Sequence, residues 1–287
     1  MGKILVTGAT GKLGSLVVEA LLEKVPASDV AVSVRNPEKA EGLHVRGVDV
    51  RQGDFDQPDT LDQAFAGIDR LLLISTDGDT ETRIRQHAAA VAAAGRAKIG
   101  FIAYTSITNA SENPIFLAEV HRATEEAIRG TGIPYSFLRN NWYLENETGS
   151  IQGVLGGVPW LTSAGAGKVG WATRRDYAQA AAAVLAGEGH ENTVYELSGP
   201  LKTQEELAAV VAAVLGREVP VQNLDDAAYA SVMVSVGVPE PVVPILVSMQ
   251  SAIRAGALEI ESQHLRKLLG REATPLEEAV RQIVSEL

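Results

Sequence analysis

The sequence of 287 residues contains no cysteine, few aromatic residues and an excess of acidic over basic side chains. Without cysteine the chain can form no disulfide, thiolate metal site or iron–sulfur cluster, and it has no thiol nucleophile. Lys and Arg number 25 against 36 Asp and Glu, which gives a net charge of −11. This charge disfavours general attraction to a nucleic-acid backbone, so an anionic ligand needs a local site of cations or backbone N–H groups.

Long hydrophobic runs are also missing. The first apolar run, Ile4–Val6, is too short for the core of a signal peptide. Val6 also stands where an N-myristoylation signal needs Ser or Thr. A later apolar stretch is broken by Pro244 and is far shorter than the roughly 20 residues that a bilayer needs. We therefore expect a cytoplasmic protein without a membrane anchor, whose 46% apolar residues are ample for a buried core.

The first half of the chain alternates short β-branched runs with helical patterns, as in a parallel sheet built from βαβ units. Apolar residues at helical spacing predict helices from Leu13 to Leu21 and from Ile84 to Ala94, with Gly95 ending the second. The predicted strands are Lys3–Thr7, Val30–Val34, Val45–Val50, Arg70–Ser75, Lys98–Thr105, Tyr135–Leu138 and Val194–Leu197. The fold class expected is α/β, a Rossmann-type doubly wound parallel sheet.

The alternation weakens after about residue 140, where Gly and Pro become more frequent and helical patterns dominate. We expect one domain over residues 1–140, joined by a strand near 193–198 that returns to its sheet. Residues 141–287 are expected to form a smaller, mainly helical lobe. Near the C-terminus, Thr274 as N-cap and Pro275 at the first helical position predict the start of a terminal helix.

A glycine-rich turn follows the first predicted strand and opens the first helix. It reads Gly8-Ala9-Thr10-Gly11-Lys12-Leu13-Gly14, a GxxGxxG pattern. Small residues at this place let the backbone approach a pyrophosphate, whose charge then lies against the helix N-terminus. The turn is no P-loop, because Val6 replaces its first glycine and Leu13 its Ser or Thr. It predicts a dinucleotide site, and the alternative is a tight turn without a ligand.

The end of the second predicted strand indicates which dinucleotide binds. NAD enzymes usually carry an acid there for the ribose 2′-hydroxyl, whereas this chain has Arg35. A guanidinium suits a 2′-phosphate, and Lys12 adds charge, so we expect NADPH (NADP) rather than NADH. The alternative is an exposed arginine at a strand end.

Two further pairs follow predicted strands at the same edge of the sheet. Asp54 and Phe55, after the third strand, are candidates to hold the edge and face of the adenine. Ser75 and Thr76, after the fourth strand, are candidates to border the ribose and the nicotinamide.

No YxxxK pair occurs, although the glycine spacing resembles short-chain dehydrogenases, whose typical members use one. The residues four positions after Tyr104, Tyr135 and Tyr143 are Thr108, Arg139 and Glu147. In the segment where the catalytic helix is expected, His121 and Glu125 form either a proton relay or an ordinary i, i+4 pair. No two of the five histidines stand at metal-ligand spacing, so no metal site is expected.

The absence of a YxxxK pair limits the reactions that the chain can catalyse. Ketone reduction passes through a strongly basic alkoxide and needs a positioned proton donor. A quinone or an extended cationic dye spreads the charge of the incoming hydride, so proximity and orientation can suffice. A conjugated acceptor is therefore favoured. The competing explanation is a non-catalytic module that senses the redox state of NADP(H).

Several stretches together resemble the NmrA-like family of atypical short-chain dehydrogenases/reductases, and within it NAD(P)H:quinone oxidoreductase type 2 and triphenylmethane reductase. The likeness covers nearly the whole chain. The stretches are Val6–Gly14, Val34–Pro37, Leu71–Ser75, Phe101–Ser106, Leu138–Asn146 and Ala172–Ala178. The fifth, Leu-Arg-Asn-Asn-Trp-Tyr-Leu-Glu-Asn, is far more specific than the glycine turn.

The resemblance implies that the first domain binds NADP and that the second lobe closes a cleft for the acceptor. The glycine turn and Arg35 would hold the phosphates, the segment 139–144 would flank the nicotinamide, and Arg174 would face the cleft. The residues expected to bind the cofactor are Gly8, Ala9, Thr10, Gly11, Lys12, Leu13, Arg35, Asp54, Phe55, Ser75, Thr76, Arg139, Asn140, Asn141, Trp142, Tyr143, Leu144 and Arg174. Those expected to bind the acceptor are Ser106, His121, Asn141, Trp142 and Tyr143.

The activity expected is hydride transfer from NADPH to a quinone-like acceptor, with reduction of triphenylmethane dyes or other conjugated substrates as the alternative. Asn141 replaces a glycine of the related quinone reductases, which predicts a smaller or more polar pocket. Trp142 either stacks on the acceptor or packs at a lobe interface, and Tyr143 or His121 is the candidate proton donor. Apolar residues 232–247 are expected to be exposed, as a homodimer contact or a lid.

Overall fold

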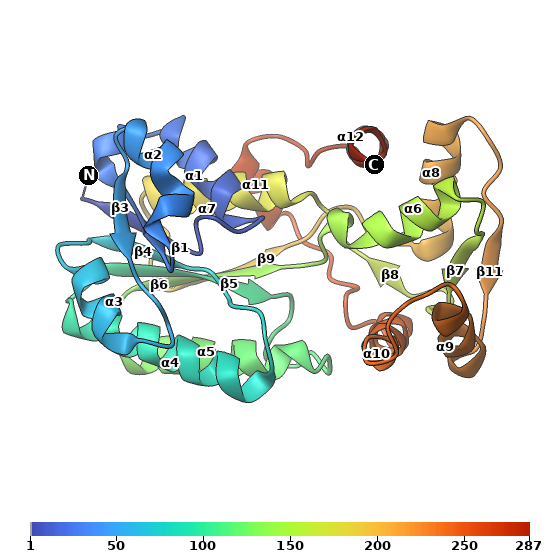
Figure 1. The fold of residues 1–287 in the computed structure, drawn as a ribbon, viewed down its shortest axis with the longest axis horizontal. Coiled ribbons are helices and arrows are strands. Elements are labelled where there is room, and N and C mark those ends of the chain that lie inside the picture. The colour runs from blue at the N-terminus through green and yellow to red at the C-terminus, as the bar shows by residue number, and fades with distance from the viewer. Residues whose placement is uncertain (1) are drawn as a thin grey trace.

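The structure, a computed structural model, describes residues 2–287 and consists of a larger and a smaller part joined by several chain crossings (Figure 1). The larger part contains a seven-stranded sheet in the order β3-β2-β1-β4-β5-β6-β9. All neighbouring strands in it are parallel. Its strands are β1 (Ile4–Thr7), β2 (Val30–Val34), β3 (Asp49–Gln52), β4 (Arg70–Leu73), β5 (Phe101–Ile107), β6 (Tyr135–Asn140) and β9 (Thr193–Leu197).

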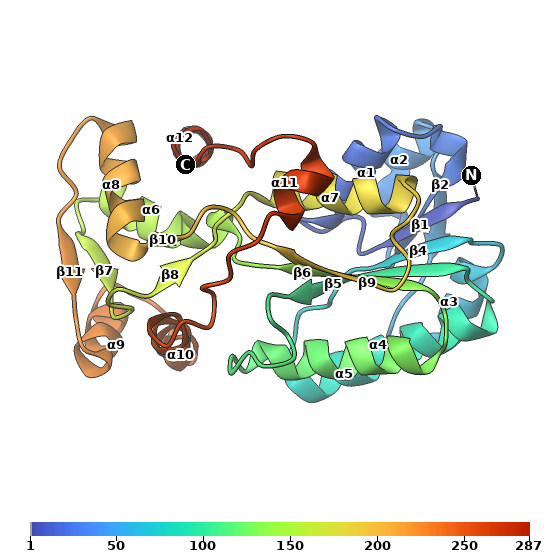
Figure 2. The same ribbon diagram turned by 180° about the vertical axis from the view of Figure 1, so that it is seen from behind.

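Helices cover both faces of this sheet, as Figures 1 and 2 show. Strands β1, β2 and β5 are buried along their whole length because each lies between two helical layers. One face carries α1 (Gly14–Leu22), α7 (Arg174–Ala186) and α11 (His264–Leu269); the other carries α3 (Pro58–Phe65), α4 (Thr80–Arg96) and α5 (Leu117–Gly130). The predicted fold class, a Rossmann-type doubly wound sheet, is confirmed.

The smaller part has its own apolar core, which includes Trp160, Trp171 and Leu207. Two small sheets frame it: β7 (Trp160–Thr162) pairs with β11 (Val221–Asn223), and β8 (Lys168–Val169) pairs with β10 (Lys202–Thr203). Its helices are α6 (Thr148–Leu155), α8 (Gln204–Leu215), α9 (Asp226–Ser235), α10 (Val243–Arg254) and α12 (Leu276–Glu286). No helix among residues 2–287 combines the length and apolar character needed to span a bilayer.

The division between the two parts does not follow one point in the sequence. Residues beyond 140 return to the larger part three times, as α7, β9 and α11. We therefore propose that the first domain consists of residues up to 140 together with these three elements, and that the substrate-cleft lobe is the remainder of 141–287.

Several predicted boundaries are wrong, among them the end of the fourth strand, which lies at Leu73 and not at Ser75. The third strand begins at Asp49, because the chain is helical in α2 (Glu41–Val45) and turns at Gly47, where φ is +88°. Gly95 lies inside α4, which continues to Arg96. The chain then turns at Lys98, with φ +55°, so that β5 starts only at Phe101.

The predicted cap of the last helix is also wrong. Pro275 is the N-cap of α12, and the helix begins at Leu276. Thr274 instead binds the fully buried carboxylate of Asp176 on α7, through its backbone N–H at 3.0 Å and its hydroxyl at 3.0 Å. A tertiary contact therefore replaces the local cap.

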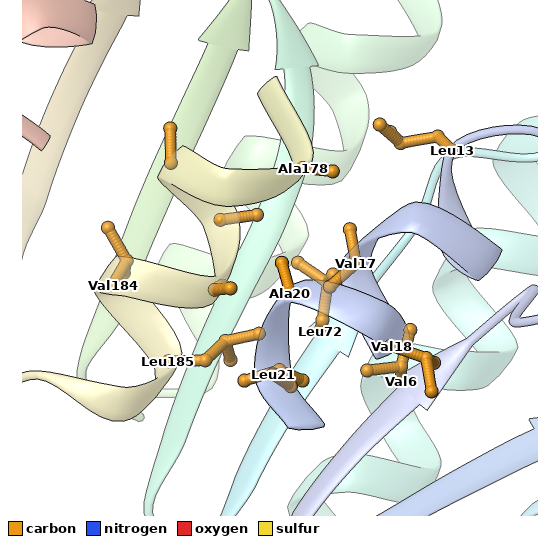
Figure 3. Close-up of a cluster of buried hydrophobic side chains, with 14 of the residues drawn as sticks. Val6, Leu13, Val17, Val18, Ala20, Leu21, Leu72, Ala178, Val184 and Leu185 are labelled. Atoms are coloured by element: carbon orange, nitrogen blue, oxygen red, sulfur yellow. The ribbon is translucent and has the colours of Figure 1, made fainter. Parts of the chain in front are cut away.

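Helices α1 and α7 pack side by side above β1 and β4 (Figure 3). The run of alanines in α7, at positions 180–183, lets the two helices approach closely because small side chains leave room for the backbone. Val17 and Leu21 of α1 and Leu185 of α7 are fully buried in this contact. The packing holds the start of α1, and hence the glycine turn, at the edge of the sheet.

Replacing Leu21 by alanine should lower the free energy of unfolding by about 2–5 kcal/mol, because it leaves a cavity between α1, α7 and the sheet. Urea unfolding followed by far-UV circular dichroism measures the change. Leu22→Ala, at a partly buried position of the same helix, is the matched control and should cost clearly less. Equal losses for the two variants would contradict the packing described here.

The core of the smaller part contains an acidic side chain. Glu147 is 8% exposed, and its carboxylate accepts a hydrogen bond from the Trp171 indole at 3.2 Å. Burial raises the pKa of Glu147 to about 7 from an ordinary value of 4.5, since loss of hydration disfavours the charged form. Between these two pH values the folded state binds more protons than the unfolded state, so stability falls as pH rises from about 4.5 to 7.

Replacing Glu147 by glutamine should remove this loss. The variant is expected to gain up to about 3 kcal/mol of unfolding free energy over the wild type above pH 7, and the gain should shrink as pH falls toward 4.5. Urea unfolding at pH 5, 6, 7 and 8 measures it. Glu126→Gln, which removes an exposed carboxylate on α5, should leave the slope of the wild type unchanged. A constant difference between wild type and Glu147→Gln at all four pH values would refute the burial argument.

Candidate cofactor and acceptor site

The glycine turn lies between the end of β1 and the start of α1. Gly8 has a φ of +60°, which favours glycine, and its carbonyl accepts a hydrogen bond from the Gly11 N–H at 2.9 Å. A Cβ on Gly14 would lie 2.2 Å from the Gly8 carbonyl oxygen, so only glycine allows the helix to start against the turn. Gly8, Thr10, Gly11 and Lys12 are exposed, whereas Ala9 and Leu13 are buried beneath them. The turn is therefore open to a ligand.

The N-terminus of α1 has no side-chain cap and no acid in its first turn. Asp79, Thr173, Thr203 and Asp225 cap the helices α4, α7, α8 and α9, whereas α6, α10 and α11 resemble α1 in having neither a side-chain cap nor an acid in the first turn. The start of α1 differs from these three because an exposed glycine turn precedes it. The first N–H groups of a helix need an acceptor from outside it, and an anion suits them best. These open amides fit the pyrophosphate of a dinucleotide.

Arg35 lies at the end of β2, next to β1 in the sheet, and is exposed. Within residues 2–287 its guanidinium forms no ion pair and no hydrogen bond. The turn that follows it is fixed, because the Asn36 side chain accepts from the Glu38 N–H at 3.0 Å and caps a short 3₁₀ helix. An arginine on a fixed turn, with no carboxylate at ion-pair distance among residues 2–287, fits a 2′-phosphate.

Asp54 binds its own turn. Its carboxylate accepts hydrogen bonds from the Asp56 N–H at 3.0 Å and from the Gln57 side chain at 3.4 Å. Phe55 is partly buried against the core beneath α3 and α4. Contacts of Asp54 and Phe55 with an adenine stay a prediction.

Neighbouring elements position Ser75 and Thr76 after β4. The Ser75 N–H donates to the Thr105 hydroxyl at 2.9 Å, and the Thr76 N–H donates to Nε2 of His87 at 3.0 Å. Since Nε2 accepts, the proton of His87 lies on Nδ1, which donates to the Thr124 hydroxyl at 2.8 Å. Burial lowers the pKa of His87 to about 4, so this neutral form persists at neutral pH.

Arg139 is engaged by the protein itself. It forms two hydrogen bonds to Glu125, at 2.9 and 2.7 Å, and one to Glu196 at 3.0 Å. The Ser106 hydroxyl donates to the same Glu125 at 2.6 Å, and all these groups except Glu196 are buried. The Arg139 guanidinium and the Ser106 hydroxyl therefore join α5 to β5, β6 and β9, and we do not include them among the ligand contacts.

His121 does not pair with Glu125, so the predicted His–Glu relay is wrong and the ordinary i, i+4 hydrogen-bonded pair is absent among the described residues as well. Nδ1 of His121 instead lies 2.9 Å from the hydroxyl of Tyr104, which burial keeps protonated by raising its pKa. Burial also lowers the pKa of His121 to about 3. Both groups are therefore neutral, and in the tautomer protonated at Nε2 the Tyr104 O–H donates to Nδ1.

Asn140 and Tyr143 form the other side of the site. The Asn140 amide nitrogen donates to the Tyr143 hydroxyl at 3.1 Å, while its Oδ1 is buried without a donor among residues 2–287. The Arg174 guanidinium lies over the Tyr143 ring, 5.1 Å from its centroid. A buried acceptor without a donor fits the amide N–H of a nicotinamide carboxamide.

The remaining residues of the segment 139–144, which are Asn141, Trp142 and Leu144, contact the smaller part of the molecule. The Asn141 side-chain nitrogen donates to the carbonyl of Leu258 at 3.0 Å and is 3.3 Å from the Ser198 hydroxyl, so this amide joins the parts. Trp142 is half-buried against the smaller core, which agrees with its packing alternative; stacking on an acceptor stays a prediction. Leu144 is fully buried there and we do not include it in the proposed site.

Sequence reasoning missed Arg83, His87 and Tyr104, which surround Ser75 on the α4 and α5 side of the sheet. Arg83 and His87 are four residues apart on α4, and this spacing was a usable signal. Among residues 2–287 no group of three or more His, Cys, Asp or Glu side chains could hold a metal. A hollow of about 600 Å³ between Pro114, Ile115, α9 and α10 is lined by none of the predicted acceptor residues.

The profile of the NmrA-like family matches residues 1–279. Quinone oxidoreductase 2 of Escherichia coli K12 is 41% identical over 278 residues, which cover 96% of this chain and 97% of that protein. The crystal structure of Citrobacter sp. triphenylmethane reductase complexed with NADP(H) is 44% identical, with a TM-score of 0.94 over 98% of this chain and 99% of that one. The E. coli quinone oxidoreductase QOR2 complexed with NADPH is 41% identical, with a TM-score of 0.93 and the same coverage.

Proposed function

The chain belongs to the NmrA-like family, and we propose that it is an NADPH-dependent reductase that transfers a hydride to a quinone-like acceptor. The observation that carries the proposal is the uncapped start of α1 behind the glycine turn, with the unpaired Arg35 at the next strand. Both features fit NADPH. A second support is the 41% identity, over nearly the full length, to the E. coli enzyme Quinone oxidoreductase 2.

The protein would bind the cofactor along the carboxyl edge of the sheet. The amides of residues 8–13 would hold the pyrophosphate, Arg35 and Lys12 the 2′-phosphate, and Ser75 and Thr76 the ribose. Asn140 Oδ1 would accept from the carboxamide, which fixes the ring orientation. When bound, NADPH supplies the hydride from C4 of its nicotinamide.

The acceptor class follows from the catalytic groups that the sequence lacks. The chain has no YxxxK pair, and the two buried histidines near Ser75 are neutral. A site of this kind orients two reactants but has no strong acid to protonate an alkoxide. A quinone needs no such acid, because conjugation spreads the charge of the incoming hydride.

Reduction of a cationic triphenylmethane dye is the second candidate function. It is favoured by the likeness to Citrobacter triphenylmethane reductase, at 44% identity and a TM-score of 0.94. A dye cation also accepts a hydride without a proton, which suits the same site.

A homodimer and a cytoplasmic location are further parts of the proposal. Val234, Val236, Val242 and Ile245 are exposed large apolar residues around α9 and α10, which confirms the predicted exposure in 232–247 and supports self-association. Sedimentation equilibrium tests the dimer, and a monomer at micromolar concentration would contradict it.

Purified protein should oxidise NADPH in the presence of 1,4-benzoquinone. The decay of NADPH absorbance is expected to be saturable in both substrates and to exceed the decay without protein. Loss of colour from a triphenylmethane dye, with no quinone activity, would favour the second function. Tight NADPH binding without turnover of any conjugated acceptor would indicate a redox-sensing module and refute both.

Arg35→Asp should raise KM for NADPH by about tenfold to a hundredfold, since an aspartate repels the 2′-phosphate that the guanidinium would bind. KM for NADH should change less than about threefold. Lys24→Asp, an equal charge change at an exposed position after α1, is the control. The assignment fails if Arg35→Asp weakens both cofactors equally.

A further inference from the structure

Two arginines are buried at the carboxyl edge of the sheet, and only one of them is neutralised. Arg139 is 8% exposed and pairs with Glu125 and Glu196. Arg83, on α4, is 7% exposed, and its guanidinium donates one hydrogen bond, from Nη2 to the Ser75 hydroxyl at 2.8 Å. Within residues 2–287 no carboxylate lies at ion-pair distance from Arg83, and its Nε is buried without an acceptor.

A buried cation without a counter-ion is costly, because it loses hydration and gains no ion pair. Another such arginine, Arg70, lies at the opposite edge, is only half-buried and donates to the Val184 carbonyl. Arg83 differs because it borders Ser75, at the proposed ribose and nicotinamide position. A buried charge retained in such a place indicates that a ligand supplies the opposite charge.

The groups that face Arg83 come from four elements and leave its charge uncompensated. They are the Ser75 hydroxyl after β4, Tyr104 on β5, His121 on α5, and His87, which lies on α4 together with Arg83. Burial and the charge of Arg83 keep both histidines neutral by lowering the pKa of each. The acid whose charge acts on Arg83 is Asp77, which is exposed and therefore well hydrated.

His121 adds a second donor. Its Nε2 makes no hydrogen bond within residues 2–287, and in the tautomer in which the Tyr104 O–H donates to Nδ1 the Nε2–H is free to donate to a ligand. A guanidinium and a neutral imidazole N–H beside a hydride donor form the kind of donor pair that stabilises developing negative charge.

We propose that Arg83 and His121 form an oxyanion site that binds an acceptor oxygen as it gains negative charge. The inference rests on the proposed function. The C4–H bond of bound NADPH would break, and the hydrogen would pass with both bonding electrons to one quinone oxygen, where a new O–H bond forms while an electron pair shifts through the conjugated ring to the opposite oxygen. NADPH becomes NADP⁺, and the quinone becomes a hydroquinone monoanion whose O⁻ lies against Arg83. Water supplies the proton that completes the hydroquinone, since His121 remains neutral throughout.

The first test needs no turnover. It adds 4-nitrophenol, whose absorbance reports its ionisation, to the complex of the protein with NADP⁺. A site that prefers the phenolate should lower the apparent pKa of the bound probe by about one unit. Arg83→Gln should abolish this shift, and Arg83→Lys should retain part of it because the charge remains. An unshifted pKa in the wild-type complex would overturn the proposal, whether or not any variant folds.

The kinetic test compares the same variants with benzoquinone and NADPH. Arg83→Gln should lower kcat by about tenfold to a thousandfold with KM for NADPH changed less than threefold, and Arg83→Lys should restore part of kcat. Arg96→Gln, at an exposed position near the end of the same helix, is the matched control. If Arg83→Gln raises KM for NADPH and leaves kcat unchanged, Arg83 only positions Ser75 and the proposal is wrong.

Failure of the inference differs from failure of the proposed function. A wild type that reduces no quinone overturns the proposed function, yet the probe still reports on Arg83 in that protein. A wild type that reduces quinones, with an Arg83→Gln variant of equal kcat and an unshifted probe, overturns only the oxyanion site.

Discussion

The contact between the Gly8 carbonyl and the α-carbon of Gly14 is the constraint on which the rest of the site depends. It sets where α1 begins, because any side chain at position 14 would collide with the turn. The N-cap residue of α1 is Leu13, whose side chain has no hydrogen-bond acceptor, so the start of the helix has no side-chain cap at the edge of the sheet. Packing of α1 against α7 keeps this edge in place, although α7 lies more than 150 residues further along the chain. In the function we propose, this close backbone packing would create the anion site without a dedicated side chain.

The two buried arginines at the carboxyl edge of the sheet differ in their partners and therefore in the role we assign to each. Arg139 has its full complement of carboxylates, so it binds β6 to α5 and β9 and has no charge left for a ligand. Arg83 has a hydroxyl as its partner and neutral histidines as neighbours. Because a parallel sheet brings the ends of β4, β5 and β6 together, the two guanidinium groups lie at the same edge of the sheet, where Arg139 joins structural elements and Arg83 would face the proposed acceptor.

Local patterns in the sequence suffice for features that depend on local physics. The glycine turn, Arg35 after β2 and the buried strands of the sheet follow from spacing and apolar runs. The role of Arg139 could not be predicted, because its partners Glu125 and Glu196 lie 14 and 57 residues away. The spacing of Arg83 and His87 on α4 is a signal that two polar groups share one helix face, but only the tertiary structure shows that no carboxylate lies at ion-pair distance from Arg83. Thr274 likewise stands where the sequence predicts the N-cap of the last helix, but it binds Asp176, which lies on α7.

The space between the two parts of the molecule depends on how the connecting segments are packed. A Cβ on Gly199 would lie 1.8 Å from the Trp171 carbonyl oxygen, and one on Gly170 would lie 1.9 Å from the Ser198 hydroxyl. The connecting segments therefore touch backbone to backbone, and Asn141 adds a hydrogen bond across them to Leu258. Because a side chain at either glycine would push these segments apart, the two contacts set the distance between the two parts. In the function we propose, the space left for the acceptor would therefore depend on this distance, and its negative charge would be bound by Arg83.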